Sequence, residues 1–138
     1  MELIDRKEIT VRFSEVDSMK IVWHGHYLKY FEDGRESFGN KYNLGYMDVY
    51  KHNVMIPIVK VTCDYKKTLV YGDTIVVETR FVNSEAAKIS FEYSIYRKGD
   101  EEIIATGSTM QVFLTPEGEL ILTPPPFFIE WKKYWKLI

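Results

Sequence analysis

The chain has 138 residues, which is enough for one domain with a hydrophobic core and too short for two ordinary ones. Its net charge of −2 argues against a nucleic-acid-binding protein, and its single cysteine excludes an internal disulfide or a cysteine-based zinc site. We expect one domain over residues 1–138. We also expect a cytoplasmic protein without a membrane span, because residues 1–10 lack an apolar signal sequence and no apolar run reaches membrane-spanning length.

The first elements predicted along the chain are a short strand and a long helix. Residues 8–13 alternate in polarity, as strands do. Further on, Tyr27, Phe31, Gly34, Phe38 and Tyr42 recur at helical spacing with charged residues between them. Glycine inside a helix costs about 1 kcal/mol relative to alanine. We therefore expect another element to pack very close to Gly34, and we expect the helical region to close at the glycines that follow.

Four strands joined by short turns are predicted after the helix. Residues 55–65 are β-rich, with Pro57 at a strand start or edge. Alternating runs follow within 69–83 and 87–98, and 102–114 forms a long last strand. Short connections favour antiparallel neighbours in chain order. One apolar sheet face needs a cover, which the long helix can provide. The sequence therefore predicts an α+β fold in which an antiparallel sheet wraps around a helix.

The C-terminal segment, residues 124–138, is amphipathic. Its aromatic residues fall on one helical stripe opposite its lysines. We expect this stripe to pack on its own domain or on a partner subunit. A membrane-surface helix is a lesser alternative, since the segment is short and only mildly basic.

The chemistry concentrates in residues 15–36, "EVDSMKIVWHGHYLKYFEDGRE". His24 and His26 suggest a metal pair, but a helix begins within this motif, and positions i and i+2 diverge on a helix. No zinc-binding pattern, nucleophilic-serine motif or phosphate loop is present. We therefore expect no metal site.

A helix start beside a carboxylate suits attack on an acyl carbonyl. Unpaired backbone N–H groups at a helix N-terminus can stabilise an oxyanion, and Gly25 would let a substrate approach the backbone closely. Asp17 lies a few residues upstream, where its carboxylate could face the same carbonyl or a water molecule. A lone aspartate in a loop is more often a cap or turn residue, and this alternative stays open on pattern alone.

The same residues resemble the start of the 4-hydroxybenzoyl-CoA thioesterase class of hotdog-fold proteins, including its Tol-Pal-associated acyl-CoA thioesterase-like subfamily. The family pattern is D-x-D-x-x-G-[IV]-V-[YFW]-[HY]-x-N-Y, followed by a helix containing E-x-[AG]-R. Asp17 falls on its second acid, Trp23 and His24 on the aromatic positions, and Tyr27 on the helix start. "DYKKTLVYGD" is similar to a later family segment, so the resemblance extends over about residues 8–114.

This resemblance implies a hotdog fold and a homodimer or homotetramer with active sites at the subunit interface. It also implies hydrolysis of acyl-CoA thioesters without a metal or cofactor, the CoA being part of the substrate. It implies that Asp17 acts as nucleophile or general base, and that the backbone N–H of His24 polarises the thioester carbonyl. The predicted catalytic residues are thus Asp17 and His24. The predicted substrate-binding residues are Trp23, Gly25, His26, Tyr27 and Lys20.

Three positions depart from the family pattern: Glu15 replaces the first acid, Lys20 the glycine, and His26 the asparagine. We expect Glu15 to be structural. Lys20 raises the greatest question, because a glycine often serves a backbone conformation. Glu32 and Arg35 are predicted to form an ion pair within the helix.

Two alternative functions follow from the same residues. One is hydrolysis of thioesters carried by acyl carrier protein, which would require a docking patch for an acidic partner. The other is a non-catalytic hotdog protein that binds acyl-CoA, because fold alone does not determine activity.

Overall fold

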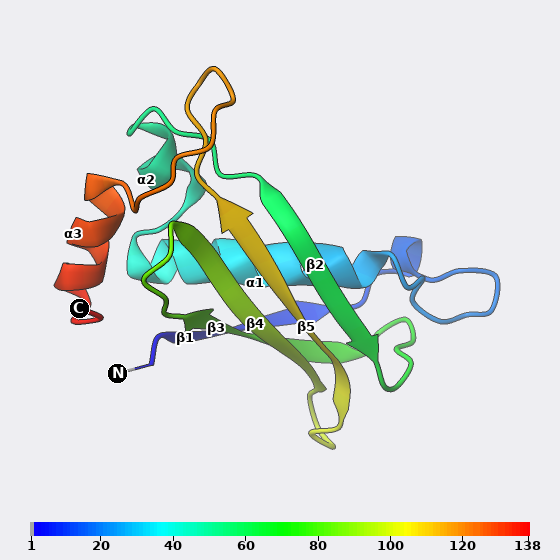
Figure 1. Ribbon diagram of the computed structural model, residues 1–138. Helices are drawn as coiled ribbons and strands as arrows, with labels where there is room; N and C mark the ends of the chain where they lie inside the picture. The colour runs from blue at the N-terminus through cyan, green and yellow to red at the C-terminus, as the bar shows by residue number, and fades with distance from the viewer. Residues whose placement is uncertain (1) are drawn as a thin grey trace.

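The computed structural model describes residues 2–138, and Figure 1 shows a five-stranded sheet with the long helix α1 against one face. The elements in chain order are β1 (Ile4–Thr10), η1 (Phe13–Glu15), α1 (His26–Tyr42), α2 (Tyr46–Tyr50), β2 (Ile58–Tyr65), β3 (Thr74–Val82), β4 (Lys88–Arg97), β5 (Ile103–Val112) and α3 (Pro126–Tyr134). This arrangement confirms the predicted α+β class.

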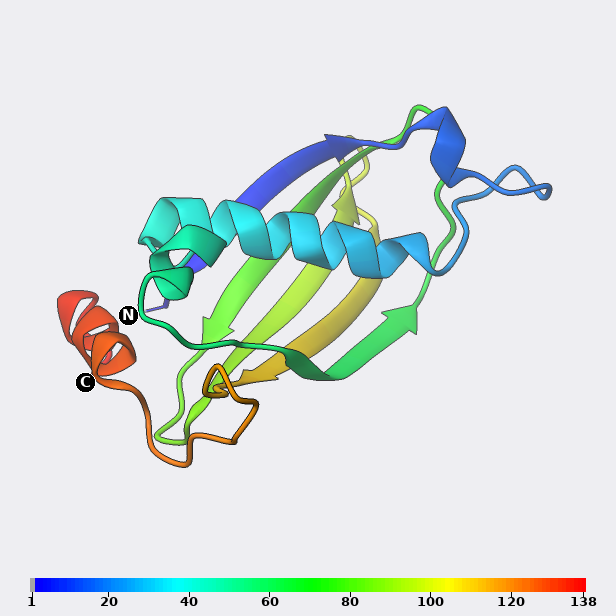
Figure 2. The same cartoon turned by 90° about the horizontal axis from the view of Figure 1, so that it is seen from above.

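The strand order across the sheet is β1-β3-β4-β5-β2, and every neighbouring pair is antiparallel. Chain-order pairing was therefore correct for β3, β4 and β5 but wrong for β2. Strand β2 pairs with β5, because residues 66–73 cross the end of the sheet instead of closing a hairpin (Figure 2). The place beside β3 is taken by β1, so both β1 and β2 lie at sheet edges.

The first strand begins earlier than predicted. It spans Ile4–Thr10 and pairs along its length with β3, whereas residues 13–15 form a 3₁₀ turn. Charged residues at positions 5–8 hide the alternation that would identify this strand.

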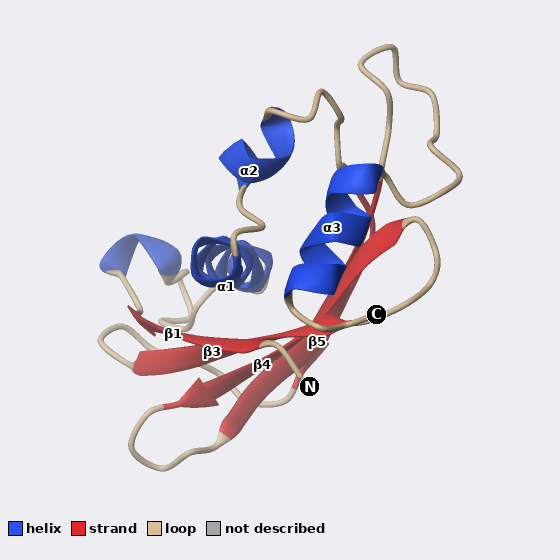
Figure 3. Ribbon diagram, turned by 90° about the vertical axis from the view of Figure 1, so that its left-hand side faces the viewer, coloured by secondary structure: helices blue, strands red, loops and turns tan. Residues whose placement is uncertain are grey.

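Helix α1 lies in the curve of the sheet, as the end-on view in Figure 3 shows. The Phe31 ring stacks on Tyr93 with ring centroids 4.6 Å apart. A Cβ atom at Gly34 would lie 2.5 Å from Thr79 Oγ1 and 2.7 Å from Val77 Cγ1, both on β3. The expectation of very close packing at Gly34 is therefore confirmed.

The end of α1 differs from the prediction. The helix continues past Gly39 to Tyr42 and is capped by Asn43 in the left-handed conformation, with φ of 60°. Gly39 instead gives room for α2, because a Cβ atom there would lie 2.8 Å from the Cα of Gly45. Periodicity could not reveal α2, which has only five residues.

The predicted ion pair within α1 is not formed. Among residues 2–138, no carboxylate lies within 4.0 Å of Arg35. Its Nη1 atom is buried and makes no hydrogen bond there. The Glu32 side chain points into solvent.

Helix α3 packs on its own domain, as expected for the C-terminal segment. Phe128 and Trp131 are buried, and the indole N–H groups of Trp131 and Trp135 both donate to the Tyr42 carbonyl, at 2.7 and 3.0 Å. Its apolar stripe is therefore used within the fold and is not free to lie on a membrane. Across residues 2–138 no helix combines the length and the apolar character needed to span a membrane.

Candidate active site

The loop that carries Asp17 is a small hairpin preceding α1. Val16 and Val22 form an antiparallel bridge, and the Asp17 N–H donates to the Ile21 carbonyl at 2.8 Å. The carboxylate is oriented by its own loop, because Asp17 Oδ1 accepts the Met19 N–H at 2.8 Å. No other hydrogen bond to this half-buried carboxylate comes from residues 2–138, so Oδ2 is available for chemistry.

Lys20 adopts the conformation that a glycine would favour. Its φ is 67°, in the left-handed region, and its N–H donates to the Asp17 carbonyl at 2.9 Å. For an L-residue this conformation costs roughly 1–2 kcal/mol. The loop therefore keeps the backbone shape expected of the family glycine, and the lysine side chain is added on its exposed side.

The start of α1 presents two free backbone donors. The Trp23 and His24 carbonyls accept the first N–H groups of the helix, from His26 at 2.9 Å and from Tyr27 at 3.3 Å. The N–H groups of His24 and Gly25 themselves donate to no acceptor in the described part of the chain. Such orphan donors at a helix N-terminus can bind an oxyanion.

Tyr65 fixes the direction of one of these donors. Its hydroxyl donates to the His24 carbonyl at 2.8 Å. The peptide bond between His24 and Gly25 is planar and trans, so its N–H points opposite to its carbonyl. The Gly25 N–H therefore points away from Tyr65. The sequence pattern matched Tyr65 to the family but gave it no role; its hydrogen bond across the end of β2 depends on the fold.

Aromatic side chains surround these donors. Trp23 is 49% exposed and lies over Gly25, where a Cβ atom would come within 2.1 Å of the indole ring. The exposed His24 ring lies 5.0 Å from the indole, and the half-buried His26 ring lies 5.5 Å from it, edge to face. These three side chains form an aromatic rim around the Gly25 backbone.

Tyr27 does not belong to this rim, contrary to its prediction as a substrate contact. It is 3% exposed and packs edge to face on Tyr65 at 5.0 Å. Burial, followed by the proximity of Cys63 and Tyr65, raises the pKa of its phenol to about 12, so it stays neutral at physiological pH. Tyr27 thus supports the site by packing against Tyr65, which bonds the His24 carbonyl.

Asp17 and His24 belong to one structural unit although their side chains do not bond to each other. The bridge of Val16 and Val22 continues in a hydrogen bond from the Trp23 N–H to the Glu15 carbonyl at 3.0 Å. This ladder fixes the acid relative to the helix start. The hairpin geometry thus holds the predicted carboxylate and the predicted oxyanion donors in one rigid segment.

Glu15 has the structural role expected of it. Its Oε1 atom accepts the Arg12 N–H at 2.8 Å and the Tyr30 hydroxyl at 3.1 Å. Burial and the nearby Glu15 carboxylate raise the pKa of the Tyr30 phenol, which therefore donates this hydrogen bond throughout the physiological range.

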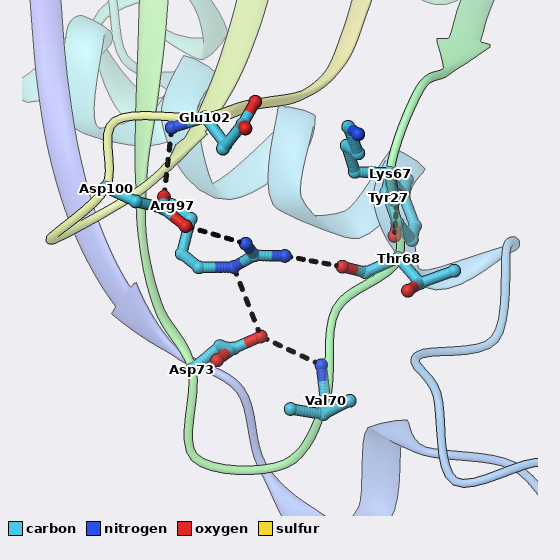
Figure 4. Close-up of polar contacts among 8 residues, drawn as sticks. All are labelled: Tyr27, Lys67, Thr68, Val70, Asp73, Arg97, Asp100 and Glu102. Atoms are coloured by element: carbon cyan, nitrogen blue, oxygen red, sulfur yellow. Dashed lines mark hydrogen bonds and ion pairs between the residues drawn. The ribbon is translucent and has the colours of Figure 1, made fainter.

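A second support for the site comes from Arg97 at the end of β4 (Figure 4). Its guanidinium donates to Asp100 Oδ2 at 2.9 Å and to the Thr68 carbonyl at 3.0 Å, and its Nε lies 3.7 Å from Asp73 Oδ2. Asp73 also accepts the Val70 N–H at 3.0 Å and so closes the turn before β3.

The segment held by Arg97 contacts the Asp17 hairpin directly. The Leu69 carbonyl accepts the Val22 N–H at 2.9 Å, so residues 68–70 lie directly against the Asp17 hairpin. No sequence feature pointed to Arg97, because Thr68 and Asp73 are distant along the chain and meet it only where the β2–β3 connection lies beside the β4–β5 turn.

The site is open on a single chain. Two hollows, of about 690 and 460 Å³, lie between β1 and α1 and between α2 and α3, and neither is lined by Asp17 or His24. Over residues 2–138 there is no group of three or more side chains that could hold a metal ion. The arrangement offers a carboxylate and backbone donors, and these lie outside both hollows.

Comparison with known proteins identifies the family of this arrangement. The model of the thioesterase-like superfamily matches residues 11–131. The chain is 39% identical over 106 residues to Bacillus subtilis (strain 168) YneP, provisionally described as an acyl-CoA thioesterase, covering 76% of this chain and 77% of YneP.

Solved structures show the same architecture. A DHNA-CoA thioesterase from Staphylococcus aureus matches with a TM-score of 0.86 and 26% identity, covering 97% of this chain and 90% of that one. The 4-hydroxybenzoyl CoA thioesterase from Pseudomonas sp. strain CBS-3 matches in fold with a TM-score of 0.80 at 20% identity, covering 93% and 98% of the two chains. The hotdog fold is therefore confirmed, and the chain belongs to the thioesterase-like superfamily.

Proposed function

We propose that this thioesterase hydrolyses acyl-CoA thioesters to a carboxylic acid and CoA. The observation that carries the proposal is the pair of free N–H groups at His24 and Gly25, held in one unit with the Asp17 carboxylate; Tyr65 directs the Gly25 N–H. This geometry provides what acyl transfer needs: a group that delivers the attack and fixed donors for the oxyanion.

In the proposed reaction the thioester carbonyl oxygen lies against the two backbone N–H groups. Asp17 either attacks the carbonyl carbon, forming an anhydride that water then opens, or takes a proton from the water that attacks. The C–S bond breaks in both routes. A CoA thiol has a pKa near ~8.5, so the thiolate leaves without a strong acid beside it.

The remaining site residues have supporting roles in this proposal. Trp23 and His26 form the rim beside the acyl group, and His24 can hydrogen-bond the substrate or the attacking water. Gly25 gives room for the indole of Trp23 over the backbone. Lys20 is exposed on the same loop as Asp17, and its ammonium can attract the phosphates of CoA. The reaction needs no metal or cofactor, because the carboxylate and the backbone supply its chemistry.

We propose a homodimer or homotetramer as the working form, in the cytoplasm. Strand β2 has one unpaired edge, and its residues Val61 and Tyr65 are 41% and 49% exposed beside α1. A second copy would pair with this edge and cover these side chains.

The first prediction concerns Asp17→Asn. This change keeps the shape of the loop, since the amide oxygen can still accept the Met19 N–H. It removes the negative charge that either attacks the carbonyl or accepts the proton of water, so kcat on acyl-CoA should fall by at least ~10²-fold. The measurement is thiol release from aromatic, short and long acyl-CoAs, with circular dichroism to confirm folding.

Asp64→Asn is the matched control, because Asp64 is exposed on the other face of β2 and should leave kcat unchanged. Equal activity of wild type and Asp17→Asn would remove Asp17 from its role. If wild type binds acyl-CoA without releasing thiol, the protein is a non-catalytic acyl-CoA-binding protein. If it hydrolyses only thioesters of acyl carrier protein, its substrate is carried by that protein and not by CoA.

A further inference from the structure

Two turns at one end of the molecule carry large apolar side chains at their corners. Residues 17–20 and 70–73 each close with a backbone hydrogen bond, of 2.9 and 3.1 Å. Met19 lies at a corner of the first turn and Tyr71 at a corner of the second, and they are 70% and 63% exposed. Turn corners usually carry small or polar residues. The fold therefore does not require a methionine or a tyrosine at these corners, and a contact outside the chain would account for them.

Phe13 joins the two turns into one surface. Its ring is 74% exposed and contacts the Tyr71 ring edge to face, with ring centroids 5.7 Å apart. The Val22 N–H links the hairpin before α1 to the Leu69 carbonyl, and the next residue, Val70, is exposed. Figures 1 and 2 both show η1, this hairpin and the β2–β3 connection at the end of the molecule opposite α3. We call this the loop-end surface, and its apolar members are Phe13, Met19, Val70 and Tyr71.

Positive charge surrounds these apolar side chains. The exposed cations of the same segments are Arg12, Lys20, Lys66 and Lys67. None of the four forms an ion pair within residues 2–138. The acids of these segments are half-buried, and each accepts a backbone N–H of its own loop; they are Glu15, Asp17 and Asp73. The exposed charge of the loop-end surface is therefore positive, although the whole chain carries −2.

An anionic lipid surface matches this combination of side chains. Apolar and aromatic side chains enter the boundary between lipid headgroups and acyl chains, while Lys and Arg contact the phosphates. An acidic protein would match the charges alone, because the hot spots of protein interfaces lie in closely packed centres. Met19 and Tyr71 instead project from separate turns. A lipid surface receives projecting side chains without a matching pocket.

We propose that the loop-end surface binds anionic lipid bilayers, with its four apolar side chains entering the headgroup region. Binding in this orientation places the active site at the lipid surface, because Met19 and Asp17 belong to one turn. A long-chain acyl-CoA held in the bilayer by its acyl group then reaches Asp17 without first dissolving in water. The lipid contact follows from the surface alone, whereas this choice of substrate rests on the proposed hydrolysis.

The test measures co-sedimentation of the full chain with lipid vesicles. Wild type should bind vesicles of equal parts phosphatidylcholine and phosphatidylserine at low salt, and should bind phosphatidylcholine alone only weakly. Each basic residue near an anionic surface strengthens binding about fivefold. Lys66→Gln together with Lys67→Gln should therefore lower the partition coefficient at least ~10-fold. The control is Lys133→Gln with Lys136→Gln, two exposed lysines at the α3 end, which should leave it unchanged.

The apolar side chains are tested in the same assay. Phe13→Ser together with Tyr71→Ser should lower the partition coefficient at least ~10-fold, because two large rings no longer leave water on binding. Both rings are exposed, so the variant should fold, which circular dichroism checks. Tyr134→Ser is the control, because Tyr134 is 72% exposed on α3. If the Lys66 and Lys67 changes weaken binding and this pair does not, charge alone holds the protein and the proposal is wrong.

Two further outcomes would overturn the proposal. In the first, wild type binds no anionic vesicle at low salt. In the second, wild type binds purified acyl carrier protein and no vesicle, and the Lys66 and Lys67 changes abolish this binding. The loop-end surface would then be a docking site for an acidic protein.

Activity separates this proposal from the proposed function. With anionic vesicles present, wild type should hydrolyse a long-chain acyl-CoA with a kcat/KM several-fold above that of the Phe13 and Tyr71 double variant. The two proteins should hydrolyse a short-chain acyl-CoA in solution equally, because neither ring belongs to the catalytic machinery. A protein that binds the vesicles through these residues and hydrolyses no thioester would overturn only the proposed function.

Discussion

At the scale of single residues, Lys20 shows how a backbone conformation can persist when the residue that favours it is replaced. The left-handed φ of 67° keeps the turn that presents Asp17, and the lysine stays exposed because the turn points its side chain outward. Compared with glycine, lysine adopts this conformation at a cost in free energy, and it adds a positive charge to the loop that carries the Asp17 carboxylate.

Lys20→Gly and Lys20→Asn separate these two effects. Glycine should raise the free energy of unfolding by up to about 1 kcal/mol, because it relieves the left-handed strain. Both variants should raise KM for acyl-CoA several-fold at low salt while leaving kcat near wild type, and the difference should shrink at high salt. Urea unfolding and initial rates measure the two effects. A KM that is unchanged at low salt would exclude Lys20 from contact with CoA.

At the scale of elements, the position of α1 is set by its smallest residue. Gly34 lets the helix rest on Thr79 and Val77 of β3, and this contact fixes the height of the helix start that carries the oxyanion donors. At this position glycine lowers the stability of the helix itself but permits the close packing of the helix on the sheet.

Gly34→Ala should lower the free energy of unfolding by about 1–3 kcal/mol, because the added methyl group overlaps two short branched side chains. Propensity alone would predict a gain of about 1 kcal/mol. The control is Asn40→Ala, at an exposed position of α1, which should be neutral or slightly stabilising. Chemical denaturation of both variants decides the sign, and a more stable Gly34→Ala protein would contradict the close-packing argument.

The elements with strong periodicity were predictable. The aromatic spacing of α1 and the alternation in β3, β4 and β5 follow directly from which side chains must be buried, and the β4–β5 turn at Gly99 has the positive φ that its sequence favours. Helix α2 and the position of β2 were not predictable. The first is too short for a period, and the second depends on where residues 66–73 cross the sheet.

The candidate site was partly predictable for a similar reason. Asp17 and the helix start are close in sequence, so their motif can be read locally. Tyr65 and Arg97 act through carbonyl groups of distant segments, and a hydrogen bond to a backbone carbonyl leaves no mark on the sequence of its acceptor.

At the scale of the whole molecule, α3 closes the core with an unusual buried charge. Lys132 is 3% exposed, its ammonium donates to the Ser84 carbonyl, and it lies 4.9 Å from the centre of the Phe128 ring. Among residues 2–138, no carboxylate lies within 4.0 Å of it. Burial lowers the pKa of this amine below its usual value of 10.5.

The unfolded chain therefore binds a proton that the folded chain releases, between the lowered pKa and 10.5. In this window the stability of wild type should rise with pH relative to Lys132→Met, which keeps the apolar stem without the charge. Unfolding in urea across pH 7–11 (roughly the range spanning the shift) measures the difference. Lys133→Met is the control, because Lys133 is exposed and should show no such trend. If the difference in unfolding free energy between wild type and Lys132→Met stays constant from pH 7 to 11 (roughly the range spanning the shift), the pKa of Lys132 is not lowered.

The two edges of the sheet have opposite characters, and this limits how far the protein can assemble. Strand β1, at the edge opposite β2, carries Asp5, Arg6, Lys7 and Glu8 in succession. Charged residues along an edge oppose the addition of another strand. If β1 could receive β2 of a neighbour, head-to-tail pairing would continue into filaments. In the proposed dimer these charges would leave β2 to pair only with itself, so sheet growth would stop after two chains.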